Sequence, residues 1–133
     1  MIKVMARQKS YGIYTGLLML MLGVAVMVFS GTAKASSSAD KYKVDASIVC
    51  MVNDNVMGKP QIPVKVEGKT YYGCCRNCVK TLNEDAAMRA AKDPFSGKMV
   101  DKSSAFIIEG PGGEALYFES ALTAGKFVDA FSK

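Results

Sequence analysis

The sequence predicts an α+β protein made of two small β-hairpin-plus-helix units with short antiparallel sheets. Two observations carry this prediction. Short apolar or alternating runs, separated by Gly, Pro and Asn turns, recur along residues 48–73 and again along residues 105–119. Each set of strand-like runs is followed by a stretch in which apolar residues have helical spacing, so strands and helices come in successive groups along the chain.

The first unit is expected at residues 48–92. A short apolar strand opens it and carries Cys50, and a Glu67-Gly68 turn closes a hairpin further along the chain. A glycine breaks the second hairpin strand, and Asn83 is expected to cap a second helical piece. The expected elements are strands at 48–52, 62–66 and 69–72 and helical segments at 75–82 and 83–93.

The second unit is expected at residues 93–133, packed with the first as one domain. The segment FSGKMVD, residues 95–101, is expected to be a loop with a turn at Ser96-Gly97. Strands at 105–109 and 115–119 follow, and the tight GPGG connection joins them. Ser120 is expected to cap a final helix that ends near residue 132. The expected apolar face of this helix consists of Leu122, Phe127, Val128 and Phe131.

Residues 1–35 have the composition of a signal peptide. A basic start precedes an uninterrupted apolar run at 16–29, and Ala33 and Ala35 fit the small-residue cleavage rule. The alternative is an uncleaved membrane anchor through residues 13–29, although this stretch is shorter than the roughly 20 residues that a spanning helix needs. Either way, the sequence predicts an exported, periplasmic protein. No cysteine stands directly after the apolar run to carry a lipid, so a lipoprotein is not expected.

Removing the targeting segment changes the charge of the chain. The full sequence has 17 basic and 12 acidic residues, and four of the basic residues leave with residues 1–35, so 13 remain. The exported part is therefore nearly neutral, which gives no case for nucleic acid as a partner. Its length suffices for one small domain behind a polar, flexible lead-in at 36–47.

The four cysteines decide the functional class. Cys74, Cys75 and Cys78 fall within five residues, and Cys50 lies well upstream. Two structural disulfides are one interpretation, but the adjacent Cys74 and Cys75 make a strained pair, and at most one of the three can reach Cys50. A second interpretation is a thiol–disulfide redox couple at Cys75-x-x-Cys78, although a hairpin precedes it where a thioredoxin-like unit has a single strand. Because the chain contains no histidine and no nucleophile–base pair is readable, an enzyme is not expected.

A metal site uses all of these features. A hairpin leads into a turn, cysteines open a helix and a further cysteine comes from an earlier strand, as in zinc ribbons and treble-clef-like cysteine knuckles. Cys78 shares a helix face with Cys74 at i, i+4 or with Cys75 at i, i+3, so the sequence leaves open which three of the four cysteines bind. Thiolates favour Cu(I), and zinc also accepts them, so the expected cofactor is Cu(I) or Zn(II).

Methionine and aromatic residues give two weaker expectations. Met51, next to Cys50, and the nearby Met57 offer thioether ligands for a soft ion. Met88 and Met99 are expected to fill the core instead. The runs YYG and LYF are expected to form an aromatic core between the two units.

The cysteine-bearing segments resemble a TRASH domain, a module related to the YHS group. The segments are VCMV and VKVEGKTYYGCCRNC, and the family has one cysteine, then a hairpin, then Cys-x-x-x-Cys opening a helix. Cys50, Cys74 and Cys78 match this pattern residue by residue, and Cys75 is additional. The resemblance implies a role in heavy-metal trafficking, resistance or sensing.

The stretch at 93–131 resembles the NosL-like accessory proteins of copper enzymes. The two resemblances together cover residues 48–131 of the chain. The NosL-like resemblance implies Cu(I) delivery, but those proteins are commonly lipoproteins, and the anchoring cysteine is missing here. The matching positions are Gly97, Val100, Asp101, Ala105, Ile107, Phe118, Ser120 and Phe127.

Taken together, these features predict an exported soft-metal-binding protein, with Cu(I) ahead of zinc. The expected mechanism is thiolate ligand exchange with an exported protein that donates or accepts the ion. The competing class is a structural module in which zinc or disulfides staple a protein-interaction surface. The composition also allows a homodimer bridged by one spare cysteine.

Overall fold

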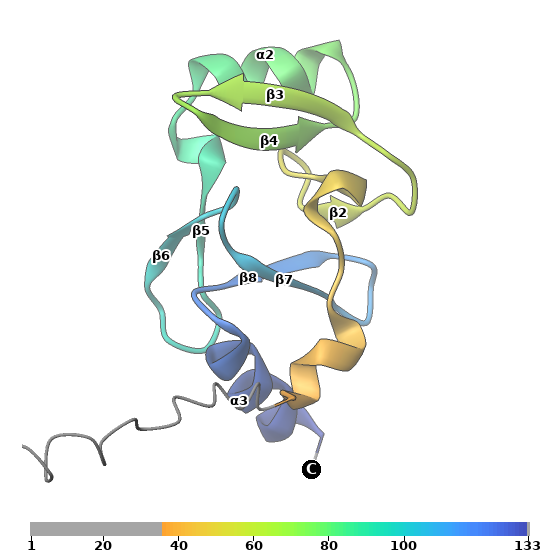
Figure 1. Ribbon diagram of the computed structural model, residues 1–133, viewed down its shortest axis with the longest axis vertical. Helices are drawn as coiled ribbons and strands as arrows, with labels where there is room; N and C mark the ends of the chain where they lie inside the picture. The colour runs from red at the N-terminus through yellow and green to blue at the C-terminus, as the bar shows by residue number, and fades with distance from the viewer. Residues whose placement is uncertain (1–35, 133) are drawn as a thin grey trace, which may run out of the picture. The chain divides into compact units, whose positions relative to one another are not determined.

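The computed structural model describes residues 36–132, and the predicted signal segment at 1–35 lies outside them. Four two-stranded antiparallel sheets and two α-helices, joined by short 3-10 turns, make up the described part, which confirms the α+β class (Figure 1). In chain order the elements are η1 (Ser38–Tyr42), η2 (Ala46–Ile48), β1 (Val49–Cys50), β2 (Asn55–Val56), β3 (Ile62–Val66), β4 (Lys69–Gly73), α2 (Arg76–Glu84), η3 (Ala87–Arg89), β5 (Ala90–Lys92), β6 (Met99–Asp101), β7 (Phe106–Glu109), β8 (Ala115–Phe118) and α3 (Ala121–Phe131).

The hairpin predicted around Glu67-Gly68 is formed by β3 and β4. Both turn residues have positive φ angles, 51° and 77°, as the two-residue turns that match the twist of a hairpin require. Val64 and Tyr71 lie opposite each other on the two strands, and both are buried. Helix α2 lies along this hairpin, with Leu82 fully buried (Figure 1). Of the alternating apolar residues of β3, Val64 is therefore buried, whereas Ile62 at the strand start is 44% exposed.

The helical piece predicted at 83–93 is wrong. Helix α2 continues through Asn83, so this residue is not an N-cap, and a 3-10 turn then leads into strand β5. Strand β5 pairs with β6, which lies in a segment expected to be a loop. Ala91 and Val100 pair across this sheet and both pack against the core. Strand pairing and burial outweigh the helix propensity of an alanine-rich stretch, because propensity is only a weak preference.

Asp93 organises the turn between β5 and β6 from inside the protein. Its buried carboxylate accepts the backbone N–H groups of Phe95 at 2.8 Å, Ser96 at 3.0 Å and Glu119 at 2.9 Å. Burial opposes ionisation, but these hydrogen bonds outweigh it and lower the pKa of Asp93. Ser120, which follows Glu119 in the chain, caps α3 as predicted, because its hydroxyl oxygen accepts a hydrogen bond from a backbone N–H of the first helical turn.

The larger hydrophobic core draws on both expected units. A smaller cluster lies beside it and is formed by Ala39, Ile108, Phe118 and Ala124. Tyr71 and Tyr117, from the two aromatic runs, are buried members of the larger core, whereas Phe118 of the LYF run belongs to the smaller cluster. The buried members of the larger core are Val49, Met51, Val64, Tyr71, Leu82, Ile107, Ala115 and Tyr117.

Residues 36–47 differ from the flexible lead-in expected from the sequence. They form two 3-10 turns, and Ala39 is fully buried. The Ser37 hydroxyl donates to a backbone carbonyl in the first turn of α3 at 2.9 Å, and the Ser38 hydroxyl donates to the Gly125 carbonyl at 3.2 Å. Two serines that look like linker residues in the sequence therefore dock this segment onto α3.

The apolar face predicted for α3 is only partly correct. Leu122 and Phe131 are 66% and 77% exposed, whereas Ala124 and Gly125 are buried. A Cβ atom at Gly125 would lie only 2.7 Å from the Ser37 hydroxyl oxygen. The smallest residues of the helix therefore face the N-terminal segment, because only they allow it to approach so closely.

Asp101, at the end of β6, links this strand to the β3–β4 hairpin. Its carboxylate accepts hydrogen bonds from the Lys69 ammonium at 2.6 Å, the Tyr71 hydroxyl at 3.0 Å and the Ser103 hydroxyl at 2.6 Å. Burial alone would raise the pKa of Asp101, but the hydrogen bonds outweigh it and lower the pKa to about 2. The folded protein therefore binds this proton less tightly than the unfolded chain does.

We expect Asp101 to make the protein lose stability in acid. An unfolded aspartate has a pKa of about 3.9, so the stabilisation is fully present above about pH 4 and is lost as the pH falls toward 2. Asp101→Asn should therefore lower the unfolding free energy at pH 7 by on the order of 2 kcal/mol and flatten its decline in acid. Urea unfolding between pH 7 and pH 2 measures both effects.

The matched control is Glu84→Gln, which changes an exposed carboxylate at the end of α2. It should leave the unfolding free energy and its dependence on pH close to those of the wild type. An equally steep loss of stability in acid for Asp101→Asn and the wild type would show that Asp101 is not the group responsible.

Candidate metal centre

Cys50 lies at the start of a tight turn that joins the very short strands β1 and β2. Residues 51–54 form this turn, and Asp54 has a positive φ of 51°, a conformation that aspartate tolerates better than most residues. The backbone N–H of Met51 donates to the carbonyl of Tyr72 at 2.9 Å. This hydrogen bond holds the Cys50 turn against the end of β4.

The other cysteines lie where β4 meets α2, as the sequence predicted. Strand β4 ends at Gly73, and Cys75 occupies the N-cap position of the helix. A Cβ atom at Gly73 would lie 3.0 Å from the Cβ atom of Cys78, which is closer than most Cβ contacts in proteins. The glycine therefore lets the strand end pass close to the first helical turn, and this brings Cys74 and Cys78 together.

Three of the four sulfur atoms form a compact group. The Sγ atoms of Cys50, Cys74 and Cys78 all lie within 4.8 Å of one another. Cys78 is central, because its Sγ atom is 3.8 Å from that of Cys50 and 3.5 Å from that of Cys74. Cys50 and Cys78 are buried, Cys74 is half-buried, and all four cysteines are free thiols. This is the cysteine knuckle that the spacing predicted.

The sulfur separations fit a thiolate-bound metal ion. Metal–sulfur bonds of about 2.3 Å at tetrahedral angles place two sulfur atoms about 3.8 Å apart. The separations of 3.8 Å and 3.5 Å from Cys78 need only small side-chain adjustments to reach this value. The three thiols can therefore hold one ion, and a fourth position would remain for an outside ligand.

The four thiols differ in how readily they ionise. Burial raises the pKa of Cys50, but backbone N–H groups of its own turn and of Cys74 outweigh this and lower it. Burial and hydrogen bonds to the other sulfurs raise the pKa of Cys78 to about 12. Hydrogen bonding with Cys50 raises the pKa of Cys74, and the backbone N–H of Cys78 lowers the pKa of Cys75. An incoming ion must therefore displace protons from Cys74 and Cys78.

Cys75, the fourth predicted site residue, lies at the edge of the group. Its Sγ atom is 3.5 Å from that of Cys78, but Cys75 is exposed and does not belong to the set of mutually close sulfurs. The spacing alone could not separate Cys74 from Cys75, because both positions suit a helix start. The direction of the chain at the end of β4 makes the distinction, and it points Cys74 toward Cys50.

The methionines do not behave as the sequence indicated. Met51 is fully buried in the larger core, which makes its thioether part of the packing, and Met57 is 38% exposed. Met88 and Met99 were expected in the core, but they are 38% and 68% exposed. The core prediction fails because Met88 lies in the 3-10 turn before β5 and Met99 is the first residue of β6, whereas an alanine and a valine of this sheet pack against the core.

A buried lysine supports the Cys50 turn. Lys102 is 3% exposed, and its ammonium group donates to the Met51 carbonyl at 2.7 Å and to the Asp54 carboxylate at 2.6 Å. It also lies 5.2 Å from the centre of the Tyr117 ring. Both acceptors belong to the turn that follows Cys50. The burial of Lys102 could not be predicted from the sequence, because a lysine in a polar stretch carries no pattern that marks it as buried.

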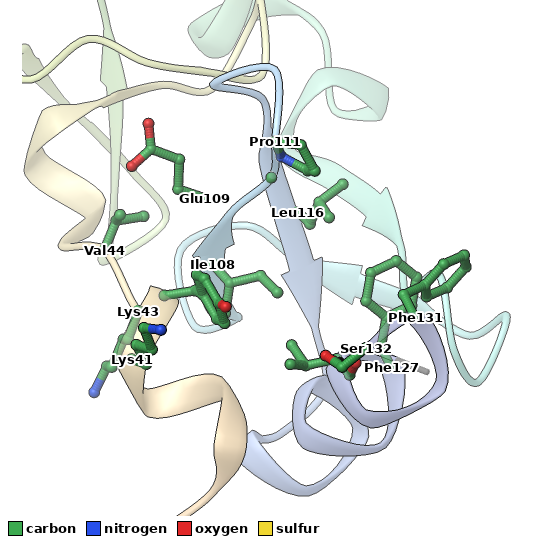
Figure 2. A pocket seen from close by; sticks show the side chains of 13 residues that line it. Lys41, Lys43, Val44, Ile108, Glu109, Pro111, Leu116, Phe127, Phe131 and Ser132 are labelled. Atoms are coloured by element: carbon green, nitrogen blue, oxygen red, sulfur yellow. Dashed lines mark hydrogen bonds between the residues drawn. The ribbon is translucent and has the colours of Figure 1, made fainter.

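A separate hollow of about 620 Å³ lies between the end of η1 with the residues that follow it, the β7–β8 hairpin and α3 (Figure 2). Apolar side chains such as Leu116, Phe127 and Phe131 line it, with Lys41 and Lys43 on the side of the N-terminal segment. No cysteine lines this hollow, so it is distinct from the candidate metal centre.

Comparison with known proteins adds no identification. No protein-family model, curated protein or solved structure matches this chain. Within residues 36–132, no helix has both the length and the apolar character needed to cross a membrane. The case for a function therefore rests on the geometry of the cysteines.

We expect Lys102→Met to weaken metal binding while the protein stays folded. The substitution leaves the Met51 carbonyl without its buried donor, so the Cys50 turn is held less firmly. Loss of a group that orients a ligand lowers metal affinity by on the order of tenfold. Competition with a chromophoric zinc chelator measures the affinity, and circular dichroism checks the fold.

Lys98→Met is the control, because Lys98 is also paired with a carboxylate, that of Glu119 at 3.1 Å, but is 70% exposed. It should leave the metal affinity unchanged. Equal affinities for Lys102→Met and the wild type would mean that the buried lysine does not support the site.

Proposed function

We propose that this protein binds one soft metal ion through Cys50, Cys74 and Cys78, with Cu(I) ahead of Zn(II), and passes it on by thiolate exchange. The observation that supports the proposal most strongly is the mutual proximity of these three sulfur atoms, all within 4.8 Å. They come from two segments far apart in the sequence, so the proximity is a property of the fold and not of local spacing alone.

The donor set favours a soft ion. All three candidate ligands are sulfur atoms, and the chain offers no histidine to make a mixed nitrogen–sulfur site. Thiolates select Cu(I) and zinc over hard cations such as magnesium or calcium. Cu(I) accepts three sulfur ligands without a fourth, whereas zinc would recruit a further ligand from solvent or from a partner.

The burial of the ligands suggests an order of exchange. Cys50 and Cys78 are buried and would hold the ion, whereas Cys74 is half-buried and exposed Cys75 lies beside it. A partner's thiolate or thioether would displace Cys74 first, and Cys75 would act as an incoming or holding ligand. The ion would pass to the partner one ligand at a time, and it would be bound by sulfur at every step.

The proposed setting is outside the cytoplasm. Residues 1–35 support export to the periplasm, with membrane association only through residues 13–29 if they are retained. The resemblance of residues 48–131 to TRASH and NosL-like proteins supports a role in heavy-metal trafficking, resistance or metalloenzyme assembly. The partner would be an exported protein that donates or accepts the ion, and this protein itself would not be an enzyme.

A structural zinc site is the alternative with an observation in its favour. The three cysteines join β1, the end of β4 and α2, and two of them are buried. An ion there would staple these elements together. The two functions differ in what happens when the ion is removed, because loss of a structural zinc unfolds a small domain.

We predict that Cys74→Ser combined with Cys78→Ser lowers the affinity for Cu(I) and Zn(II) by at least about 100-fold, because two of three ligands are lost. Cys75→Ser, one residue away and outside the group, is the control and should keep most of the affinity. Chelator competition under anaerobic conditions provides the measurement. An unchanged affinity in the double variant would contradict the proposal.

We further expect the wild-type protein to give up its ion to an excess of chelator without unfolding. The far-ultraviolet circular dichroism spectrum and the urea midpoint should then remain those of a folded domain. Unfolding in step with metal loss would favour the structural staple over the transfer function.

A further inference from the structure

The exposed Cys75 thiol contacts the central ligand of the proposed site. Its Sγ atom lies 3.5 Å from the Sγ atom of Cys78, which is 5% exposed and touches both other members of the group. Binding of the ion needs only the three mutually close sulfurs, so Cys75 takes no part in holding the ion before exchange begins. A solvent-exposed thiol at the start of a helix, three residues from a metal ligand, is placed to meet small reagents before that ligand does.

We propose that Cys75 is an oxidation site that couples a hydroperoxide to metal release, by forming a disulfide with Cys78. This inference rests on the proposed metal-binding function. The Cys78 sulfur lies within 3.8 Å of each of the other three, so its oxidation removes the central member of the group. Its conversion to a disulfide leaves only Cys50 and Cys74 as ligands, and two thiolates hold the ion far less tightly than three.

The chemistry balances with a hydroperoxide as the oxidant. The Cys75 sulfur, as thiolate, attacks one peroxide oxygen, the O–O bond breaks, and hydroxide leaves a sulfenic acid on Cys75. The Cys78 sulfur then attacks the sulfenic sulfur, which forms the S–S bond and expels a second hydroxide. Cys78 is a ligand of the ion and therefore reacts as a thiolate, so the Cys75 thiol proton and one proton from solvent convert the two hydroxides to water. In total, one thiol and one metal-bound thiolate lose two electrons, one hydrogen peroxide becomes two waters, and the ion loses the Cys78 ligand.

The surroundings favour Cys75 over the other thiols as the first to react. Cys50 is fully buried, and Cys74 is half-buried with the Asn53 amide nitrogen 3.7 Å from its sulfur. A bond between the neighbours Cys74 and Cys75 would be strained. The Cys75–Cys78 pair has the spacing of known redox dithiols at helix starts, and its sulfurs already lie 3.5 Å apart.

The experiment uses protein produced from the full-length sequence, loaded with Zn²⁺, which itself does not react with peroxide. Hydrogen peroxide is added, and a zinc-sensitive dye follows the release of the ion. Cys75→Ser should release zinc at least about tenfold more slowly than the wild type. Serine is a favoured N-cap residue, so this variant should keep helix α2, and Cys75→Ala provides a second test. Asn77→Ser, an exposed position in the same turn, is the control and should release zinc at the wild-type rate.

Peptide mapping identifies the disulfide. Trypsin cuts after Arg76, which separates Cys74 and Cys75 on one peptide from Cys78 on the next. In the oxidised wild type these two peptides should be linked, with a loss of two hydrogens, and the link should be missing in Cys75→Ser. A link from Cys78 to the peptide that carries Cys50 would overturn the inference.

The kinetic result separates this inference from the function on which it rests. If the wild type and Cys75→Ser both bind zinc and lose it to peroxide at the same rate, the inference falls and the metal-binding function stands. If neither protein binds zinc before peroxide is added, both fall together. Slower release in Cys75→Ser and Cys75→Ala, with normal release in Asn77→Ser, supports both.

Discussion

The candidate site depends on the close approach of the Cys50 turn, the end of β4 and the start of α2. Gly73 makes this approach possible, because an added Cβ atom would lie 3.0 Å from the Cβ atom of Cys78. The hydrogen bond from the Met51 N–H to the Tyr72 carbonyl, 2.9 Å long, fixes the turn against the same strand end. Sulfur atoms 28 positions apart in the chain thereby come within 3.8 Å of each other.

The second half of the chain takes part in this arrangement through Lys102. A buried lysine is costly unless its charge is paired and its donors are used. Both conditions are met here, because the ammonium group lies 2.6 Å from the Asp54 carboxylate and 2.7 Å from the Met51 carbonyl. The hairpins and the cysteine knuckle therefore form one connected structure.

The sequence was informative wherever a local pattern determines the geometry. Alternation along 62–66 and the Glu67-Gly68 turn define the β3–β4 hairpin, and the spacing of Cys74 and Cys78 places both at a helix start. Prediction failed where partners distant in the sequence decide. The alanine-rich stretch at 83–93 looks helical, but its pairing with β6 makes part of it a strand. The exclusion of Cys75 from the sulfur group, and the burial of Lys102, depend on how separate segments meet, and no local pattern encodes that.

The most direct test of the account is native mass spectrometry of the protein recovered anaerobically from cells, with thiols counted on the same sample after metal removal. We predict one copper or zinc ion per chain and four free thiols, in agreement with the four unpaired cysteines of the structure. The mass of the ion would also separate Cu(I) from Zn(II). A chain without metal that has lost four hydrogens, and therefore contains two disulfides, would contradict the account and make the cysteines a structural framework.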